Sequence, residues 1–389
     1  MTPKQRVMEA VNHREPDRIP FDIGASAVTS IHYLAYNDLM VLLGKGHAAH
    51  DKHQTEFMDI VQSIVQVDEA FVNDFKVDAR GLTPGSFKER WDDHVQRKGD
   101  EDVMTDRFGG KWFRPLSGFY FDQLPDSFPM AGFKSEVEVE DFDWPELINQ
   151  ETLSELRDSL QSLGKDFALL VGEPIGGVFN TGFKLRGYST FYLDLAGDVK
   201  MARCILDKIA EIKMRYWEKV LREAGDLIDI VVLEDDLGHQ ETLMISPLMY
   251  RNIIKPYHQR LVSHVKHIAP GHIKIMLHSC GSIYRLIPDL IEVGFDILNP
   301  IQTTAAEMDT AVLKREFGSD LVFWGGGIDI QKVLPFGTLS EVEYEVEKRI
   351  NDLAPGGGFV FAATHNIQPH TPPQNIMKMW EVFQKNCSY

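Results

Sequence analysis

The amino-acid sequence predicts an α/β protein built as a single (β/α)8 TIM-type barrel. Short apolar runs alternate with amphipathic segments of helical period, which is typical of parallel strands joined by crossover helices. The apolar runs number eight, the strand number of a closed barrel of this type. No linker or internal repeat divides the chain, so residues 1–389 are expected to form one domain.

The expected elements follow in chain order. The predicted strands are Ile19–Ile23, Asp74–Asp78, Phe167–Val171, Asp229–Glu234, Ile273–His278, Phe295–Asn299, Leu321–Trp324 and Gly358–Ala362. The predicted helices are Lys200–Ala224, Pro247–Ile268, Ser282–Val293 and Ser340–Leu353. Asp198 and Ser246 can cap the first two helices at their N-termini, and Gly294 can end the third.

Residues 81–140 break this rhythm. Their aromatic residues, such as Trp112, are scattered among turn residues such as Gly109 and Gly110. We therefore expect a β-hairpin insertion after the second strand.

The composition restricts the class of protein. A net charge of −18 and the lack of a dense Lys/Arg run argue against nucleic acid or an anionic membrane as partner. The three cysteines are too few for a disulfide framework, and residues 1–25 carry charges where a signal peptide would be apolar. No apolar stretch approaches the roughly 18–20 residues of a membrane span. A protein of the reducing cytoplasm is expected.

The most specific local pattern is Leu-His-Ser-Cys-Gly at Leu277–Gly281, directly after a predicted strand. In extended backbone, residues i and i+2 point to the same side, so His278 and Cys280 can both reach one metal ion at roughly 2.0–2.3 Å. The alternative is a chance pair in which the cysteine is a small hydrophobic core residue. The pattern suggests a zinc site.

A barrel places chemistry on the loops at the C-terminal ends of its strands. The polar residues expected at that rim are Asp22, Asp78, Glu173, Glu234, Asp235, Asp236, His278, Cys280, Asn299, Gln302 and His365. The three adjacent acids after the fourth strand are candidate catalytic residues, which could ligate a metal, accept a proton or orient His278. The alternatives are an acidic cap for the next helix and, for His365, a hydrogen-bonded loop histidine. His239, His264, His267 and His272 have no such strand-end position and are expected to be surface or capping residues.

Five polar residues are candidates for binding substrate: Asp22, Glu173, Tyr188, Asn299 and Gln302. Tyr188 belongs to an aromatic-rich stretch that runs from Phe179 to Tyr192. These aromatic side chains could line a pocket for an aromatic substrate or simply pack helices.

With these motifs in view, the chain resembles the uroporphyrinogen decarboxylase superfamily, which includes the decarboxylases and the zinc-dependent corrinoid methyltransferases. The resemblance covers most of the chain and rests on residues 1–20, Asp235-Asp236-Leu237-Gly238, Ile245-Ser246-Pro247, Leu277–Gly281 and His365–Pro369. It implies a (β/α) barrel that is frequently a homodimer.

Within the superfamily, the chain resembles the methyltransferases more than the decarboxylases. The early Arg-Gln-Ala-Gly-Arg motif that holds the decarboxylases' substrate carboxylates is replaced here by Phe21–Ser26, in which Asp22 has the wrong charge. His278 and Cys280 match the His-x-Cys zinc ligands of the methyltransferases. Those that transfer to a small thiol carry a cysteine as third ligand where this chain has His365, which resembles the histidine of the decarboxylases' late Gly-His-Gly segment. The resemblance therefore leaves the third ligand open among His365, Asp235 and Glu234.

The resemblance implies a zinc-dependent transfer of a methyl group between a small methylated substrate and a corrinoid protein. Zinc would bind the ether oxygen, amine or thiol of the substrate, such as a methoxylated aromatic or a methylamine, and cob(I)alamin on the partner would take the methyl group. Asp235 or Asp236 would orient a ligand or manage a proton. Two alternatives remain: a decarboxylase that needs no cofactor, and a catalytically silent binding protein. The sequence leaves the methyl donor, the acceptor and the direction of transfer open.

Overall fold

A seven-stranded parallel sheet forms the centre of the computed structural model, which describes residues 1–45, 51–86, 88–197 and 199–389. Its strands are β3 (Ala79–Leu82), β9 (Ala168–Val171), β10 (Ile230–Glu234), β11 (Lys274–His278), β12 (Ile297–Asn299), β13 (Val322–Trp324) and β14 (Phe359–Val360). They pair in the order β14-β13-β12-β11-β10-β9-β3, and every pair is parallel. The predicted α/β barrel fold is confirmed.

The ring is completed by the predicted first strand, of which only a short piece is paired. Phe21 forms a single parallel bridge with Phe361, and the N–H of Phe361 donates to the carbonyl of Pro20 at 2.9 Å. On the other side, the N–H of Asp78 donates to the carbonyl of Phe21 at 2.8 Å. Residues 20–22 therefore hydrogen-bond to the β14 and β3 edges and occupy the eighth position.

The predicted second strand, Asp74–Asp78, was wrong by several residues. Asp68 accepts a hydrogen bond from the N–H of Phe71 at 2.8 Å and so caps helix α3 (Glu69–Asp74), which occupies the first residue of that prediction. The strand begins only at Ala79. Asp78 consequently lies at the N-terminal end of β3, where it is buried and paired with Arg6 (2.6 Å) and Arg18 (2.7 Å), far from the catalytic rim of a barrel.

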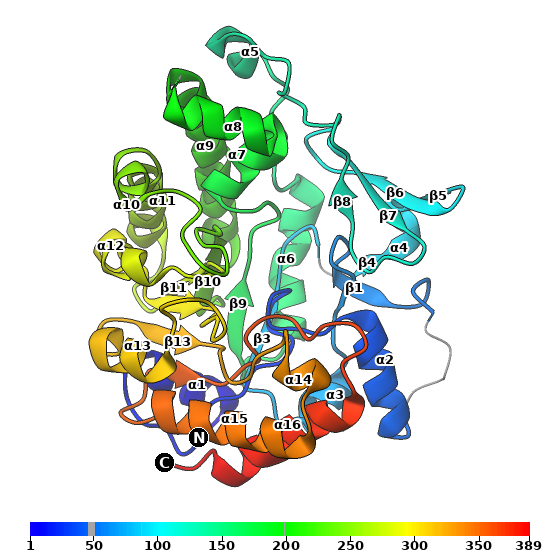
Figure 1. Cartoon of the computed structure of the whole chain (residues 1–389), viewed down its shortest axis with the longest axis vertical. Coiled ribbons are helices and arrows are strands. Elements are labelled where there is room, and N and C mark those ends of the chain that lie inside the picture. Colours follow the sequence, from blue (N-terminus) through cyan, green and yellow to red (C-terminus); the bar gives the residue numbers. More distant parts are fainter. Residues whose placement is uncertain (46–50, 87, 198) are drawn as a thin grey trace.

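The insertion is antiparallel, as predicted, but larger than one hairpin. Strands β5 (Gln96–Lys98), β6 (Glu101–Thr105), β7 (Lys111–Pro115) and β8 (Asp122–Gln123) form one antiparallel sheet. A second sheet joins β4 (Glu89–Arg90) to β1 (Glu56–Asp59) and β2 (Ile64–Val65), which precede β3 in the chain. Figure 1 shows this region on the side opposite α10 to α13.

Helices surround the sheet (Figure 1). Their bounds are α1 Pro3–Val11, α2 Tyr33–Leu42, α4 Trp91–His94, α5 Glu136–Glu140, α6 Gln150–Ser162, α7 Val178–Arg186, α8 Tyr188–Ala196, α9 Val199–Ala224, α10 Pro247–Met249, a π-helical turn Tyr250–Ile254, α11 Lys255–Ile268, a 3₁₀ turn Tyr284–Leu286, α12 Ile287–Val293, α13 Thr310–Phe317, α14 Val333–Phe336, α15 Leu339–Leu353 and α16 Pro373–Asn386. The predicted helices Lys200–Ala224 and Ser340–Leu353 are confirmed. The predicted helix Pro247–Ile268 is interrupted by the π-helical turn, and the predicted helix Ser282–Val293 is α-helical only from Ile287. Ser246 caps α10, Gly294 ends α12 with φ 101°, and Asp198 lies outside the described residues.

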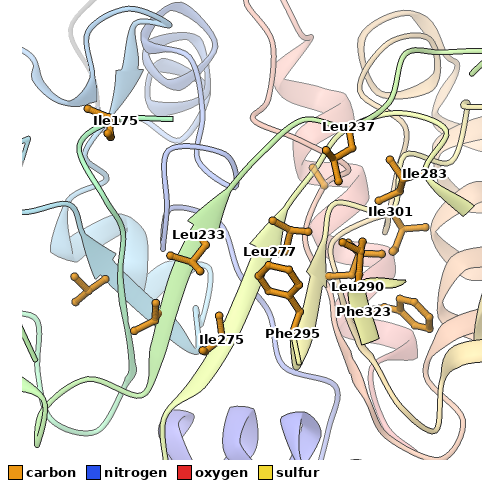
Figure 2. Close-up of a cluster of buried hydrophobic side chains, with 14 of the residues drawn as sticks. Ile175, Leu233, Leu237, Ile275, Leu277, Ile283, Leu290, Phe295, Ile301 and Phe323 are labelled. Atoms are coloured by element: carbon orange, nitrogen blue, oxygen red, sulfur yellow. The ribbon is translucent and has the colours of Figure 1, made fainter. Parts of the chain in front are cut away.

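Side chains alternate between two cores along each barrel strand, because successive residues of a strand face opposite sides. Val231 belongs to the outer core beneath the helices. Leu233, Ile275 and Leu277 belong to the same core (Figure 2). The inner core fills the barrel with residues such as Ile230, Val232, Met276, Ile297 and Val322, and α1 closes its N-terminal end with Val7, Ala10 and Val11. The same alternation turns Glu234, His278 and Asn299 toward the barrel interior.

Among the described helices, none combines the length and the apolar character that crossing a membrane requires.

Candidate metal centre

The floor of the candidate site is one row of inward-facing residues at the C-terminal strand ends. Glu234 of β10 is in register with His278 of β11, and His278 is in register with Asn299 of β12. All three end strands whose preceding inward residues are apolar. The site therefore lies at the end of the barrel where its loops gather.

Asn299 fixes the orientation of His278. The side-chain N–H of Asn299 donates to the carbonyl of Trp324 at 2.9 Å, so its Oδ1 faces His278 Nδ1 at 2.6 Å and must accept. The proton of His278 is therefore on Nδ1, and the lone pair is on Nε2. A metal-ligating histidine needs this arrangement, in which the second ring nitrogen donates to an oxygen of the protein.

Cys280 stands beside that lone pair. Its Sγ lies 3.4 Å from His278 Nε2. Two ligands of one tetrahedral zinc, with Zn–S of about 2.3 Å and Zn–N of about 2.0–2.1 Å, lie about 3.5 Å apart. The turn that places the thiol is tight: Gly281 has φ 90°, and a Cβ there would lie 2.3 Å from the backbone of Gly238.

Burial, together with the nearby Asp236 and Glu234 carboxylates, raises the pKa of the Cys280 thiol well above its ordinary value. The thiol is therefore protonated when no cation is present. A divalent cation at this position would displace the proton and neutralise the local negative charge. The charge distribution thus favours a cation beside Cys280.

His365 completes a cluster of three. The ligand atoms of His278, Cys280 and His365 lie within 4.8 Å of one another, and the two imidazole rings are 5.1 Å apart between centroids. Burial, and next the neighbouring His278, lower the pKa of His365 to about 4, so its ring is neutral at pH 7. Glu234 and Asp235, the other candidates for third ligand, are not in this cluster.

The donor set fits zinc, which prefers thiolate and imidazole ligands. At His365, however, the ring proton is on the wrong nitrogen for coordination through Nε2. The N–H of Asn366 donates to His365 Nδ1 at 2.8 Å, so the ring proton is on Nε2. Coordination through Nε2 requires the proton to move to Nδ1 and the bond to Asn366 to be given up. His278 and Cys280 need no such change.

The three acids after β10 have separate surroundings. Asp236 is at the site: its side chain is 45% exposed, its Oδ1 accepts from the N–H of Cys280 at 2.8 Å, and the same oxygen is 4.0 Å from His278 Nε2. Glu234 lies in the floor, and burial raises its pKa.

Asp235 has a structural role. Its two carboxylate oxygens accept from the N–H groups of Phe179 and Asn180 at 2.9 Å each, at the start of α7. His258 Nε2 lies 2.9 Å from the same carboxylate. The sequence left open that the three acids cap the next helix. Asp235 does cap a helix, but that helix is α7, which precedes it in the chain. Glu234 and Asp236 do not cap it.

Of the candidate substrate residues, two contact residues of the Leu277–Gly281 segment and one does not. Asn299 touches His278, and Gln302 accepts from the N–H of Gly281 at 2.7 Å. Tyr188 is 59% exposed and stacks on Phe183, with centroids 4.8 Å apart.

Two further candidates are buried acids held by internal partners. Asp22 accepts from Trp324 Nε1 at 2.8 Å and from the N–H of Ala25, and burial raises its pKa to about 6. Glu173 pairs with the buried Lys213 and accepts from Trp217 Nε1 at 3.1 Å, and burial raises its pKa to about 7. Neither acid lies in the cluster of three.

A cavity of about 360 Å³ opens onto the cluster. Its lining residues are Gly238, His239, Gln240, Cys280, Gly281, Gln302, Thr304, Asp329, Ile330, Gln331, Thr364 and His365. Sequence reasoning missed most of this wall and assigned His239 to the surface, where it is indeed exposed although it also lines the cavity. The only sequence feature that could have predicted these lining residues is their position after strand ends. Their residue types do not differ from those of an ordinary polar loop.

The comparisons with known proteins agree with this architecture. The family model "Uroporphyrinogen decarboxylase (URO-D)" matches residues 131–386. Uroporphyrinogen decarboxylases from two strains of Thermus thermophilus are each 25% identical over 190 residues, which cover 49% of this chain and 50% of theirs. The chain thus spans about half the length of the curated relatives it matches.

A solved structure titled "methyltransferase from Methanosarcina mazei" superimposes with a TM-score of 0.67 at 16% identity, over 99% of both chains. Similarity at this level of identity shows a shared fold. Because the family model matches more than half of the chain, this protein belongs to the uroporphyrinogen decarboxylase family.

Proposed function

We propose that this protein is a methyltransferase that holds zinc at His278, Cys280 and His365 and exchanges a methyl group with a corrinoid carried by a partner protein. The observation that carries the proposal is the imidazole–thiol pair of His278 and Cys280, 3.4 Å apart, of which Cys280 lines a 360 Å³ cavity. Zinc bound there would act as a Lewis acid on the heteroatom that carries the methyl group. The name of the structural neighbour from Methanosarcina mazei supports the same class of reaction.

The cavity also favours methyl transfer over decarboxylation of a polycarboxylate. Family membership and the curated relatives make a decarboxylase the second candidate. A substrate with several carboxylates needs Arg or Lys partners. Among the described residues that line the cavity, none is Arg or Lys, and Asp329 adds a negative charge.

The lining indicates a small, uncharged or cationic substrate. The side-chain amides of the wall are linked by hydrogen bonds: Gln302 Nε2 donates to Gln240 Oε1 at 2.8 Å, and Thr304 Oγ1 donates to Gln331 Oε1 at 3.1 Å. Such groups can hold hydroxyl, ether or amine substituents by hydrogen bonds. The volume is at the lower end of the range for small-molecule sites.

Three residues of the chain would then have defined tasks. Asn299 holds the His278 ring so that Nε2 faces the cation. Asp236, half exposed beside Cys280, is placed to take a proton from the heteroatom that receives a methyl group. His365, neutral at pH 7, would be the third ligand after its proton moves to Nδ1.

A protein partner that brings the corrinoid needs a surface beside the cavity. Leu193 of α8 and Leu248 of α10 are 72% and 67% exposed. These helices belong to the segments that follow β9 and β10, and their exposed leucines are candidates for contact with the partner.

Metal content of the purified protein is the first test. We expect about one zinc per chain in the wild type, and its loss in Cys280→Ser and His278→Gln. Cys204→Ser is the matched control, because Cys204 lies on α9, outside the cluster, and should keep the metal. A wild type that stays free of metal after zinc is supplied would contradict the proposal.

Activity is the second test. Zinc-loaded protein should move a labelled methyl group from a methylated ether or amine to free cob(I)alamin, and Cys280→Ser should abolish the transfer. Release of carbon dioxide from a carboxylated substrate by metal-free protein would instead establish the decarboxylase.

A further inference from the structure

A second cavity, of about 510 Å³, lies between the N-terminal part of the chain and the antiparallel insertion. It shares no lining residue with the cavity at the metal centre. Lys52, Arg97 and Arg114 line it together with Tyr33, Phe119 and His370. Cations concentrated on one cavity are unexpected in a chain with a net charge of −18.

The three cations share one carboxylate. Asp102, buried on β6, accepts from Arg114 at 2.6 Å, from Lys52 at 2.8 Å and from Arg97 at 2.9 Å. Three positive charges against one negative charge leave a formal excess of two. Asp51 also lines the cavity, with Oδ1 accepting from the N–H of His53 at 2.9 Å, and it reduces the excess to one.

Arg114 is the most constrained of these cations. It is only 4% exposed, and its guanidinium lies 4.3 Å from the Trp91 ring centroid and 5.4 Å from that of Phe121. Its Nε–H is buried and has no acceptor among the described residues. A buried guanidinium is costly unless its charge and its donors are met, and the described part of the protein leaves this one donor of Arg114 without a partner.

Lys52 is also surrounded by an excess of positive charge. Its ammonium lies 4.1 Å from the Trp91 centroid, so two cations face one ring. Burial, and after it the adjacent Arg114 and Arg97, outweigh the hydrogen bond to Asp102 and lower the pKa of Lys52. Since nearby positive charge disfavours a charged ammonium, an added anion would stabilise Lys52 in its charged form.

Part of the remaining wall is apolar or aromatic, beside the polar Asp51, His53 and Ser117. Tyr33, Leu34, Leu116 and Phe119 line it, and His370 packs edge-on against Phe119 with centroids 5.0 Å apart. These apolar side chains can contact the apolar part of an organic ligand, whereas an inorganic ion would leave them exposed to water.

We propose that this cavity binds a small organic anion, with its carboxylate or phosphate group at Lys52, Arg97 and Arg114 and its apolar body against Tyr33 and Phe119. The geometry of guanidinium groups suits both anionic groups. Because cations line this cavity and, among described residues, no Lys or Arg lines the metal-site cavity, the two take ligands of different charge.

Isothermal titration calorimetry of the full chain tests the proposal with phenyl phosphate, benzoate and the uncharged benzyl alcohol at constant ionic strength. We expect at least one of the two anions to bind at about one site per chain, and benzyl alcohol to give no signal. Phenyl phosphate and benzoate distinguish phosphate from carboxylate as the preferred group. Arg97→Gln should weaken binding roughly tenfold or more, since a charge-assisted hydrogen bond is lost.

Lys98→Gln is the matched control, because Lys98 is the next residue of β5 and does not line the cavity. Arg97 is half exposed, so its variant should fold; should it unfold, Lys52→Gln takes its place. Cys280→Ser shows whether the anion sits on the metal instead. Loss of binding in Cys280→Ser, equal weakening in Lys98→Gln and Arg97→Gln, or no binding of either anion would each overturn the proposal.

Discussion

Replacing Asn299 with alanine tests how the proposed metal ligand His278 is held in orientation. The change removes the acceptor at 2.6 Å from His278 Nδ1 and the donor at 2.9 Å from the Trp324 carbonyl. Each buried group left without a partner costs about 1–3 kcal/mol, so we expect a loss of about 2–6 kcal/mol in the free energy of unfolding. Metal affinity should fall about 10–100-fold, because the ring and its tautomer are no longer fixed.

The matched control is Asn375→Ala. Asn375 is also buried and also makes two hydrogen bonds, to the carbonyls of Leu334 and Gly337 at 2.9 Å each, but it lies on α16. It should lose comparable stability and keep its metal affinity.

Metal affinity would be measured by competition with a chromophoric chelator, and stability by denaturant unfolding with and without zinc. A 10–100-fold weaker affinity reduces the stabilisation by saturating metal by about 1.4–2.7 kcal/mol. If Asn299→Ala bound zinc within about twofold of the wild type while Cys280→Ser lost it, the assigned role of Asn299 would be refuted.

Three further predictions concern the metal ligands, the insertion and α7. Metal affinity should rise about tenfold per pH unit near neutrality, because burial raises the pKa of Cys280 and binding must displace its proton; chelator competition at several pH values measures the slope. In the insertion, burial alone would raise the pKa of Asp102, but its three cations lower it to about 2. The stability it contributes is therefore present above about pH 4 and is lost as pH falls toward about 2, which acid titration followed by circular dichroism would detect. Gly177→Ala should destabilise the protein by about 1–3 kcal/mol or more in thermal unfolding, since a Cβ would lie 2.0 Å from the Glu234 carbonyl oxygen, whereas Gly271→Ala, with nothing within 4 Å of its Cβ, should be neutral.

The strands of the barrel were predictable where their signal was local. From β9 to β14, apolar runs marked each strand to within about two residues, because a strand buried on both faces must be continuously apolar. The second strand was misplaced because Val72, Phe75 and Val77 are equally apolar but pack around a capped helical turn and the chain that follows it. Asp68 was available in the sequence as a helix cap, but the apolar run that follows it led to the prediction of a strand.

The insertion shows a different limit. Its scattered aromatic residues indicated antiparallel structure, but not that β4 would pair with β1, which is earlier in the chain than β3. Such pairing depends on contacts between distant segments, for which the local pattern carries no signal.

The sequence by itself determined the fold class and placed the two main candidate ligands together. The period of two along β11 turns His278 inward, and the spacing His-x-Cys brings Cys280 beside it, so both follow from local backbone geometry. Only the tertiary structure decided which acid does what: Asp235 and Asp236 are adjacent in sequence, but one caps α7 and the other stands beside Cys280. It also decided the tautomer of His278, through the side chain of Asn299, 21 residues away in the chain. The physical reason is that hydrogen-bond partners and burial are set by residues distant in the chain, and a polar residue has no preference of its own for one partner over another.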